Sequence, residues 1–219
     1  MSPRRSALVA GALYLLTFAA IPTLSLYSAI KTPGHILGPA GDGPARAAAL
    51  LEVIVALACI GTAVVLYPMI RRAAPTRALG FVMSRTLEAA MIFVGVGVML
   101  TLIGMHGASG ATGAGEHGLV SAYDASFLLG QSLMPGINAL LLGTVLYQTR
   151  LIPRLIPLIG LIGAPIHLAA VLATLLGVIE PLSPLTVIGA APIALWEFSL
   201  GVYLVVKGFR AEAVVGEAI

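Results

Sequence analysis

The sequence predicts an all-α fold, a polytopic bundle of six transmembrane helices with the N- and C-termini in the cytoplasm. Composition is the first reason. The chain of 219 residues is 59% hydrophobic and 10% charged, whereas soluble domains are about 25% charged. A soluble fold of this size has too much surface to hide so much apolar side chain. A lipid bilayer removes this constraint, so we expect a membrane protein.

Six continuous apolar runs are the second reason. Each reaches the ~20 residues that a helix needs to cross a bilayer, and none alternates in polarity as the strands of a membrane β-barrel do. The first run follows Arg4 and Arg5, but it is too long for a signal peptide and no small-residue cleavage pattern ends it. Within a single transmembrane domain over residues 1–219, we expect spans at about 6–30, 47–70, 79–104, 122–148, 155–178 and 185–206.

The basic residues predict the orientation. They occur in short clusters between the apolar runs rather than in one patch, so we expect no nucleic-acid partner. With the N-terminus inside, only Lys31 and Arg46 lie in outer loops and nine basic residues lie in cytoplasmic segments, which is the bias that cytoplasmic loops show. The nine are Arg4, Arg5, Arg71, Arg72, Arg77, Arg150, Arg154, Lys207 and Arg210.

Prolines and small residues predict how the helices bend and pack. A proline within a span is expected to kink the helix or loosen one turn, and small residues four apart are expected to let two helices approach closely. The lone cysteine, Cys59, is expected to pack as a small buried hydrophobe. The prolines are Pro22, Pro135, Pro165 and Pro192, and the small residues are Ser132 and Gly136 in the fourth span and Ala169, Ala173 and Gly177 in the fifth.

Three charged residues within the spans are the main functional signal. Arg85 and Glu88 lie early in the third span and Glu197 lies in the sixth. Each charge at a helix centre costs roughly 2.5–3.5 kcal/mol on insertion scales, so the three should face the bundle interior and pair. Arg85 and Glu88 are three residues apart and share a helical face. The guanidinium has enough donors to reach both carboxylates, which would tie the third helix to the sixth.

Asn138, His167 and Trp196 are expected at overlapping depth and complete the candidate set. Two interpretations stay open. The charges are either a structural staple between helices or the lining of a polar ligand-binding cavity, and a carboxylate beside His167 would also relay protons. The candidate residues are Arg85, Glu88, Asn138, His167, Trp196 and Glu197.

The other histidines fall in the outer loops. With Glu116, the three residues His35, His106 and His117 offer the ligand types that zinc takes, but their spacing matches no zinc signature and flexible loops hold ligands poorly. A bis-histidine haem would need a second histidine facing His167 at its depth. We therefore expect no metal site and no cofactor.

Several short motifs carry a family resemblance. They are Arg85-x-x-Glu88, Leu-Tyr-Pro at 66–68 followed by basic residues, Trp196-Glu197-Phe198, and Lys207-Gly208-Phe209-Arg210. Over roughly residues 5–210 they resemble a bacterial integral-membrane family, domain of unknown function 4386. The family pattern includes an Arg and a Glu in the third helix and a Glu in the sixth, which correspond to Arg85, Glu88 and Glu197. The resemblance implies a multi-pass protein of the bacterial cytoplasmic membrane and implies no reaction.

The function expected from the residues is non-enzymatic: binding or transport of a small molecule, an ion or a proton at the intramembrane Arg/Glu site. Two alternatives stay open. One is an intramembrane enzyme acting on a lipid or isoprenoid, with a carboxylate or His167 as base. The other is a structural or regulatory subunit in which the charges only join helices. The expected partners are the lipid bilayer, a small molecule or ion, and a second copy in a homodimer.

Overall fold

The computed structural model describes residues 2–37, 41–106, 112–181 and 183–210, and these ranges hold helices and no strand. The predicted all-α class is confirmed. Six helical stretches are long and apolar enough to cross a membrane, as expected. They are Pro3–Leu26, Gly43–Ile70, Pro75–Gly104, Gly113–Thr149, Leu155–Leu175 and Pro184–Val206.

Two of the six stretches are interrupted. The first comprises α1 (Pro3–Thr17), the 3-10 turn η1 (Phe18–Ala20) and the short α2 (Thr23–Leu26). The fourth comprises α5 (Gly113–Phe127), the π-helical segment η3 (Leu128–Leu133) and α6 (Met134–Thr149). The others are the continuous helices α3 (Gly43–Ile70), α4 (Pro75–Gly104), α7 (Leu155–Leu175) and α8 (Pro184–Val206), and a 3-10 turn, η2 (His35–Leu37), precedes α3.

The predicted prolines divide into two kinds. Pro22 lies just before α2, where the first stretch is broken, and Pro135 is the second residue of α6, just after the π-helical segment. Proline has no N–H to donate to the preceding turn, so both places can lose the regular hydrogen-bond ladder. Pro165 and Pro192 lie inside α7 and α8, which continue through them.

The fourth stretch begins earlier than the sequence suggested. Helix α5 starts at Gly113 rather than near residue 122, so part of the expected Gly-rich loop is helical. Thr112 caps it, since its hydroxyl accepts from the Gly115 amide, and Glu116 lies in the first turn, where a carboxylate suits the helix dipole. These local signals lay within a Gly- and Ala-rich stretch that looked like a loop. Residues 107–111 lie outside the described part of the chain.

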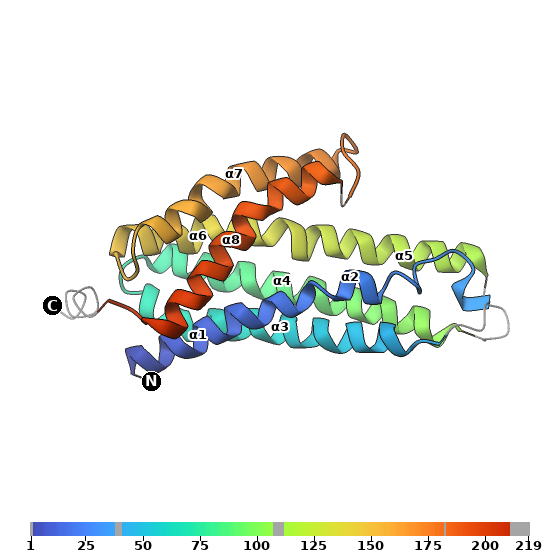
Figure 1. Ribbon diagram of the computed structural model, residues 1–219, viewed down its shortest axis with the longest axis horizontal. Helices are drawn as coiled ribbons and strands as arrows, with labels where there is room; N and C mark the ends of the chain where they lie inside the picture. The colour runs from blue at the N-terminus through green and yellow to red at the C-terminus, as the bar shows by residue number, and fades with distance from the viewer. Residues whose placement is uncertain (1, 38–40, 107–111, 182, 211–219) are drawn as a thin grey trace.

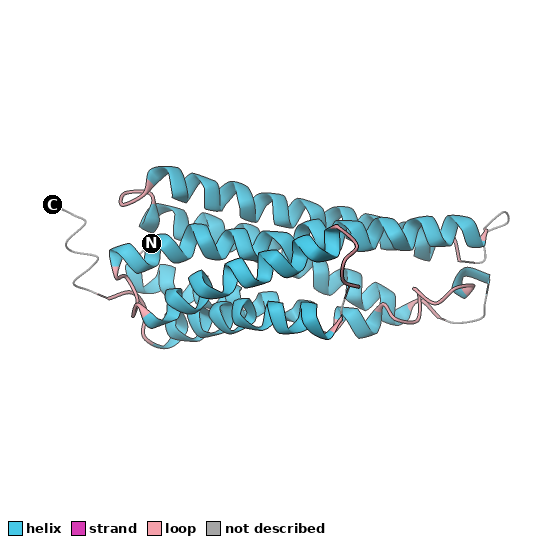
Figure 2. Cartoon of the chain, turned by 90° about the horizontal axis from the view of Figure 1, so that it is seen from above, coloured by secondary structure: helices cyan, strands magenta, loops and turns pink. Residues whose placement is uncertain are grey.

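The helices run nearly along one axis and define two ends (Figures 1 and 2). At the terminal end α1 begins and α8 finishes, and Arg4 Nη2 donates to the Val205 carbonyl over 2.9 Å. At the distal end lie η2, the start of α3, the end of α4 and the start of α5. Figure 1 shows the α7–α8 hairpin leaning away from α2 and α3 and stopping well short of the distal end.

Helix α4 is longer than a bilayer requires. Helix α4 has 30 residues, which is ~45 Å at the usual rise per residue. The hydrocarbon core of a bilayer is ~30 Å thick. Helices α7 and α8 are shorter, with 21 and 23 residues, and the ends of α4 and α5 extend past them at the distal end (Figure 1).

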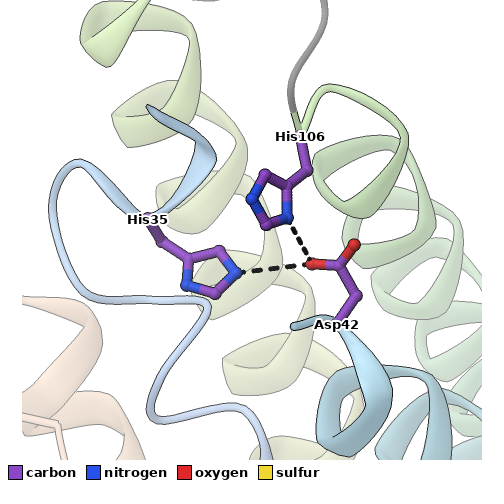
Figure 3. Close-up of side chains that lie close together, drawn as sticks. All are labelled: His35, Asp42 and His106. Carbon is purple, nitrogen blue, oxygen red and sulfur yellow. Dashed lines mark hydrogen bonds and ion pairs between the residues drawn. The ribbon is translucent and has the colours of Figure 1, made fainter. Parts of the chain in front are cut away.

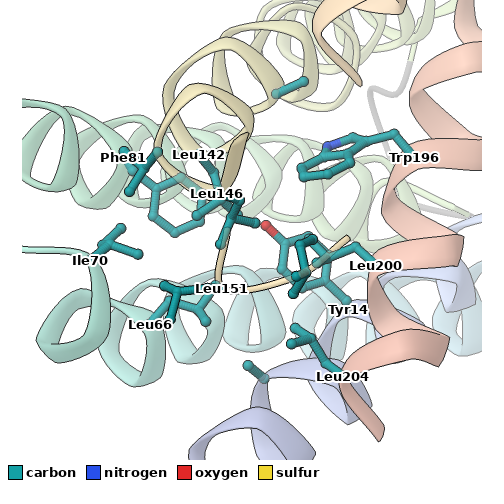
Figure 4. Packing of buried hydrophobic residues seen from close by; sticks show 14 of the residues in the cluster. Tyr14, Leu66, Ile70, Phe81, Leu142, Leu146, Leu151, Trp196, Leu200 and Leu204 are labelled. Atoms are coloured by element: carbon teal, nitrogen blue, oxygen red, sulfur yellow. The ribbon is translucent and has the colours of Figure 1, made fainter. Parts of the chain in front are cut away.

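The main apolar core lies toward the terminal end, where α1, α3, α4, α6 and α8 meet (Figure 4). Its large buried side chains are Tyr14, Leu66, Phe81, Leu142, Trp196, Leu200 and Leu204.

Close helix packing uses glycines other than the predicted ones in α7. A Cβ on Gly160 would lie 2.7 Å from Trp196 Cδ2, and one on Gly11 would lie 2.6 Å from the Gly201 carbonyl oxygen. The expected packing face of Ala169, Ala173 and Gly177 is wrong. Ala169 and Gly177 are exposed, and Gly177 (φ 71°) follows the end of α7 in a left-handed conformation. Gly136, in contrast, does lie against α7, beside Leu168.

Candidate functional site

Arg85 is the centre of the intramembrane polar site. Its Nη1 donates to Glu88 Oε2 and its Nη2 donates to Glu197 Oε1, each over 3.0 Å. The guanidinium therefore joins α4 to α8 while also pairing with a carboxylate one turn along its own helix. Only 1% of the Arg85 side chain is exposed, against 6% for Glu88 and 12% for Glu197, so the charges pair where water does not screen them.

Further groups surround this ion pair. Asn138 Nδ2 on α6 donates to Glu88 Oε2 over 2.7 Å, so one carboxylate oxygen serves both Arg85 and Asn138. Arg85 Nη1 also contacts Cys59 Sγ at 3.6 Å, and Cys59 is fully buried in α3. The Tyr14 ring lies 4.8 Å from the guanidinium carbon, within cation–π range. Five spans, carrying Tyr14, Cys59, Arg85, Asn138 and Glu197, thus converge on one site.

A cavity of about 210 Å³ opens beside these charges. Its polar lining includes Arg85, Glu88, Glu197, His167 and Gln131. The remaining lining is mainly apolar and comes from the break between α1 and α2, from α3, from α6 and from α8: Thr17, Phe18, Ala20, Ile21, Val55, Pro135, Ala190, Ile193 and Ala194.

His167 reaches this cavity from α7. Its Nε2 lies 2.6 Å from the carbonyl oxygen of Ser132, in the π-helical segment. Since a carbonyl only accepts, Nε2 carries the proton of the neutral ring and Nδ1 carries the lone pair. His167 and the Arg85 cluster therefore line the same cavity, but the structure has no direct contact between His167 and a carboxylate among the residues it describes.

Trp196 is placed differently from the other candidates. It neighbours Glu197 in sequence, yet it is 1% exposed and packs in the apolar core against Gly160. It does not line the cavity. Successive residues of a helix point about 100° apart, which explains why Glu197 faces the cavity while Trp196 faces α7.

A second buried carboxylate lies closer to the distal end. Glu52 on α3 is fully buried and accepts three hydrogen bonds, from Tyr27 (3.2 Å), Tyr123 (2.7 Å) and Gln131 (3.1 Å). Gln131 also lines the cavity, so it lies between the two polar clusters. A tyrosine near a span end is typical of an interface anchor, whereas Tyr27 and Tyr123 are both buried against Glu52.

The outer histidines are arranged in a way that the sequence did not suggest. His35 and His106 both contact Asp42, whereas His117 is exposed on α5. Glu116 instead accepts from the backbone amides of Gly34 and His35, each at 3.0 Å. Partial burial disfavours the charged carboxylate of Asp42, but the bonds from the two imidazoles outweigh this and hold its pKa below the ordinary value. His35 and His106 were singled out from the sequence, but Asp42 was not.

Comparison with known proteins gives a family. The family model described as domain of unknown function (DUF4386) matches residues 9–208, which is most of the chain. The chain belongs to the DUF4386 family. The expected resemblance is confirmed, and with it a multi-pass membrane protein of an uncharacterised family. No curated protein and no solved structure matches the chain.

Membership in the DUF4386 family does not assign a role to the site around Arg85. The DUF4386 match spans every helix that lines the cavity and contributes to the Arg85 cluster. The family description names no reaction and no ligand, so the chemistry of this DUF4386 protein has to be argued from its own residues.

Proposed function

We propose that this protein binds a small solute within the membrane, in the cavity beside Arg85, Glu88 and Glu197. The solute would carry a positive charge or a hydrogen-bond donor on an otherwise apolar body. Binding, rather than helix stapling alone, is the interpretation that the unpaired polar atoms favour.

The observation that carries this proposal is a pair of buried polar atoms on cavity-lining residues. Arg85 Nε and His167 Nδ1 are buried and have no hydrogen-bond partner among the described residues. Leaving a buried donor or acceptor unpaired costs about 1–3 kcal/mol. A purely structural staple does not explain why two residues that line one cavity each leave a buried polar atom unpaired. A donor group of a bound solute would satisfy His167 Nδ1, and an acceptor atom of the solute or of a bridging water would satisfy the N–H of Arg85 Nε.

Charge supports the cationic or proton-donating character of the solute. The cluster holds one guanidinium and two carboxylates, so with all three ionised its formal charge is −1. An uncompensated charge in an apolar environment is costly, so the cluster should attract either a proton or a cationic group. Glu197 is the more exposed carboxylate, so it is the residue we expect to contact the solute.

The size of the cavity limits the solute. An apolar protein cavity of about 150 Å³ takes up benzene, and drug-sized ligands need about 300–1,000 Å³. The cavity of about 210 Å³ therefore suits a solute slightly larger than benzene. The apolar side chains around it suit a hydrophobic body, and the charges at one side would orient its polar group.

Native mass spectrometry of the protein in mild detergent tests the proposal. The wild type should retain a stoichiometric mass that Glu197→Gln loses. Ala190→Phe fills the cavity without touching a charge and should lose the same mass. Ala191→Phe is the matched control, because Ala191 is exposed on the adjacent face of α8 and does not line the cavity. A wild-type mass kept equally by Ala190→Phe, or a well-folded wild type without any retained mass, would contradict binding in this cavity.

Transport is a second candidate, favoured by the interrupted helices. The α1–α2 break supplies four lining residues, Thr17, Phe18, Ala20 and Ile21, and the π-helical segment with Pro135 supplies two more. Transporter binding sites are typically built from discontinuous helices. If this protein transports the solute found by mass spectrometry, proteoliposomes should exchange it, with Ala190→Phe inactive and Ala191→Phe active. Binding without exchange would leave a receptor or sensor instead.

A further inference from the structure

The distal end carries a second cluster of polar side chains, His35, Asp42 and His106 (Figure 3), and none of the three lines the cavity. It joins three segments that are separate in the chain. His35 begins the η2 turn, Asp42 directly precedes α3, and His106 follows the end of α4. All three lie outside the candidate membrane spans, so an ion in the aqueous phase could reach them.

The distances fit coordination of one ion. His106 Nδ1 lies 2.9 Å from Asp42 Oδ1, His35 Nε2 lies 3.4 Å from the same oxygen, and the three donor atoms are within 4.8 Å of one another. Zinc bonds to nitrogen and oxygen are about 2.0–2.2 Å long, which separates neighbouring tetrahedral ligands by about 3.3 Å. A small inward shift of the two rings would therefore close a three-ligand site.

The surrounding structure holds these ligands in place. Glu116 is 2% exposed and accepts from the amides of Gly34 and His35, which fixes the backbone at the first ligand. Gly34 adopts φ +84°, a conformation that favours glycine at this turn. The ligand loop is thus tied to α5 by a buried carboxylate, so it is not the free loop that the sequence suggested.

Asp42 gives a second, independent observation. It occupies the N-cap position of α3, where an aspartate usually accepts from the first amides of the helix. Its side chain makes no such capping bond and turns to the two imidazoles. Because Asp42 contacts the two imidazoles instead of capping α3, its carboxylate is already directed at the other two candidate ligands.

We propose that His35, Asp42 and His106 form a divalent metal site of the zinc type, with a fourth position open to solvent. Two imidazoles and one carboxylate suit Zn²⁺ and its first-row neighbours. A neutral imidazole binds through its lone pair once the ring proton occupies the other nitrogen, so each ring changes tautomer when the metal replaces the present hydrogen bonds. Asp42 and His106 each keep 17% of the side chain exposed, which leaves a path for the ion.

The bound ion would link the α2–α3 connection to the end of α4, outside the bilayer. That position is separate from the Arg85 cavity, so this inference goes beyond the proposed solute binding and does not depend on it. The metal would hold the outer ends of three helical segments together, and its fourth position would accept water or an external ligand.

Cobalt(II) is the probe for the test, because tetrahedral Co²⁺ absorbs visible light strongly. The full chain in detergent, stripped with a chelator, should bind one Co²⁺, develop the tetrahedral absorption bands, and lose them when Zn²⁺ is added. His106→Gln and the near-isosteric Asp42→Asn should weaken Co²⁺ binding by at least about a hundredfold, since even second-shell changes cost about 10–100-fold. His117→Gln is the matched control and should bind as the wild type does.

Several results would contradict the proposed metal site. A wild type that binds neither Co²⁺ nor Zn²⁺ at micromolar concentration would overturn the site, as would equal affinities of Asp42→Asn and the wild type. A His117→Gln variant as defective as His106→Gln would assign binding to a different group of residues. Circular dichroism of each variant checks the fold, and Asp42→Asn keeps the test decisive if His106→Gln does not fold.

Discussion

Arg85 and Glu197 are 112 positions apart in the chain, yet Arg85 Nη2 donates to Glu197 Oε1 over 3.0 Å inside the bundle. The same guanidinium holds Glu88 on its own helix. The bond ties α8, the last helix, to α4, and the cavity lies beside it. The stability of the helix packing and the chemistry of the cavity thus depend on one side chain.

Removing the guanidinium should destabilise the protein strongly. Arg85→Met leaves Glu88 and Glu197 buried without their cation, and stranding a buried ion partner costs about 3–5 kcal/mol. The free energy of unfolding in mixed micelles, measured by detergent titration, should fall by that amount. Arg72→Met is the control, because Arg72 is exposed and its replacement should change the free energy of unfolding only slightly.

A triple variant separates lost pairing from lost packing. Arg85→Met combined with Glu88→Gln and Glu197→Gln carries no unpaired charge, so it should recover a large part of the stability lost in Arg85→Met. Equal unfolding free energies for the single and the triple variant would mean that the side-chain volume of Arg85, and not its charge, supports the bundle.

The two tyrosines that donate to Glu52 should contribute unequally to the stability of the protein. Tyr123→Phe removes the 2.7 Å bond to Glu52 and Tyr27→Phe removes the 3.2 Å bond. Loss of a partner from a buried carboxylate costs about 1–3 kcal/mol, and we expect Tyr123→Phe to lie nearer the upper value. Tyr203→Phe, whose hydroxyl bonds to no residue in the described part of the chain, is the control for the measurement of unfolding. A larger loss in Tyr27→Phe would reverse the assignment of the stronger bond.

The pairing of Arg85 with two carboxylates could be predicted from the sequence. Charges in a span must face the interior and pair, and Arg85 had two carboxylates at compatible depth. The six spans were foreseeable for the same reason, because length and apolarity alone define them. The rest depended on contacts between distant segments. The cavity is lined in part by the break in the first span near Pro22 and by the π-helical segment before Pro135, and a proline in a sequence does not specify how its helix will break.

The cluster at the distal end also depends on contacts between distant segments, which the sequence does not show. Asp42 directly before a helix is typical of an N-cap and did not point to a histidine. Glu116 was grouped with the histidines as a ligand type, but it accepts from the backbone amide of His35 instead. The two histidines lie 71 positions apart, and only the fold brings them to one carboxylate. Trp196 shows the opposite case, because its neighbour Glu197 suggested a shared pocket that the helical rotation separates.

Helix packing at Gly160 should be intolerant of a side chain. A Cβ there would lie 2.7 Å from Trp196 Cδ2, between α7 and α8. Gly160→Ala should therefore destabilise the protein by about 1–3 kcal/mol, as overpacking in a core does. Gly97→Ala is the matched control, since no atom lies within 4 Å of a Cβ at Gly97. If thermal unfolding shows Gly160→Ala to be as stable as Gly97→Ala, the tryptophan must be able to move away from α7.

The orientation expected from the basic residues gives the last prediction. Arg72 and His117 are exposed at opposite ends of the bundle, and the lone native cysteine, Cys59, is fully buried and should not react. Cysteine replacements at these two positions should therefore report the two sides of the membrane. A membrane-impermeant maleimide should label His117→Cys in intact cells and label Arg72→Cys only after lysis, because basic loops stay in the cytoplasm. The reverse pattern would place the three-residue cluster of His35, Asp42 and His106 in the cytoplasm, where its metal would come from the cell interior.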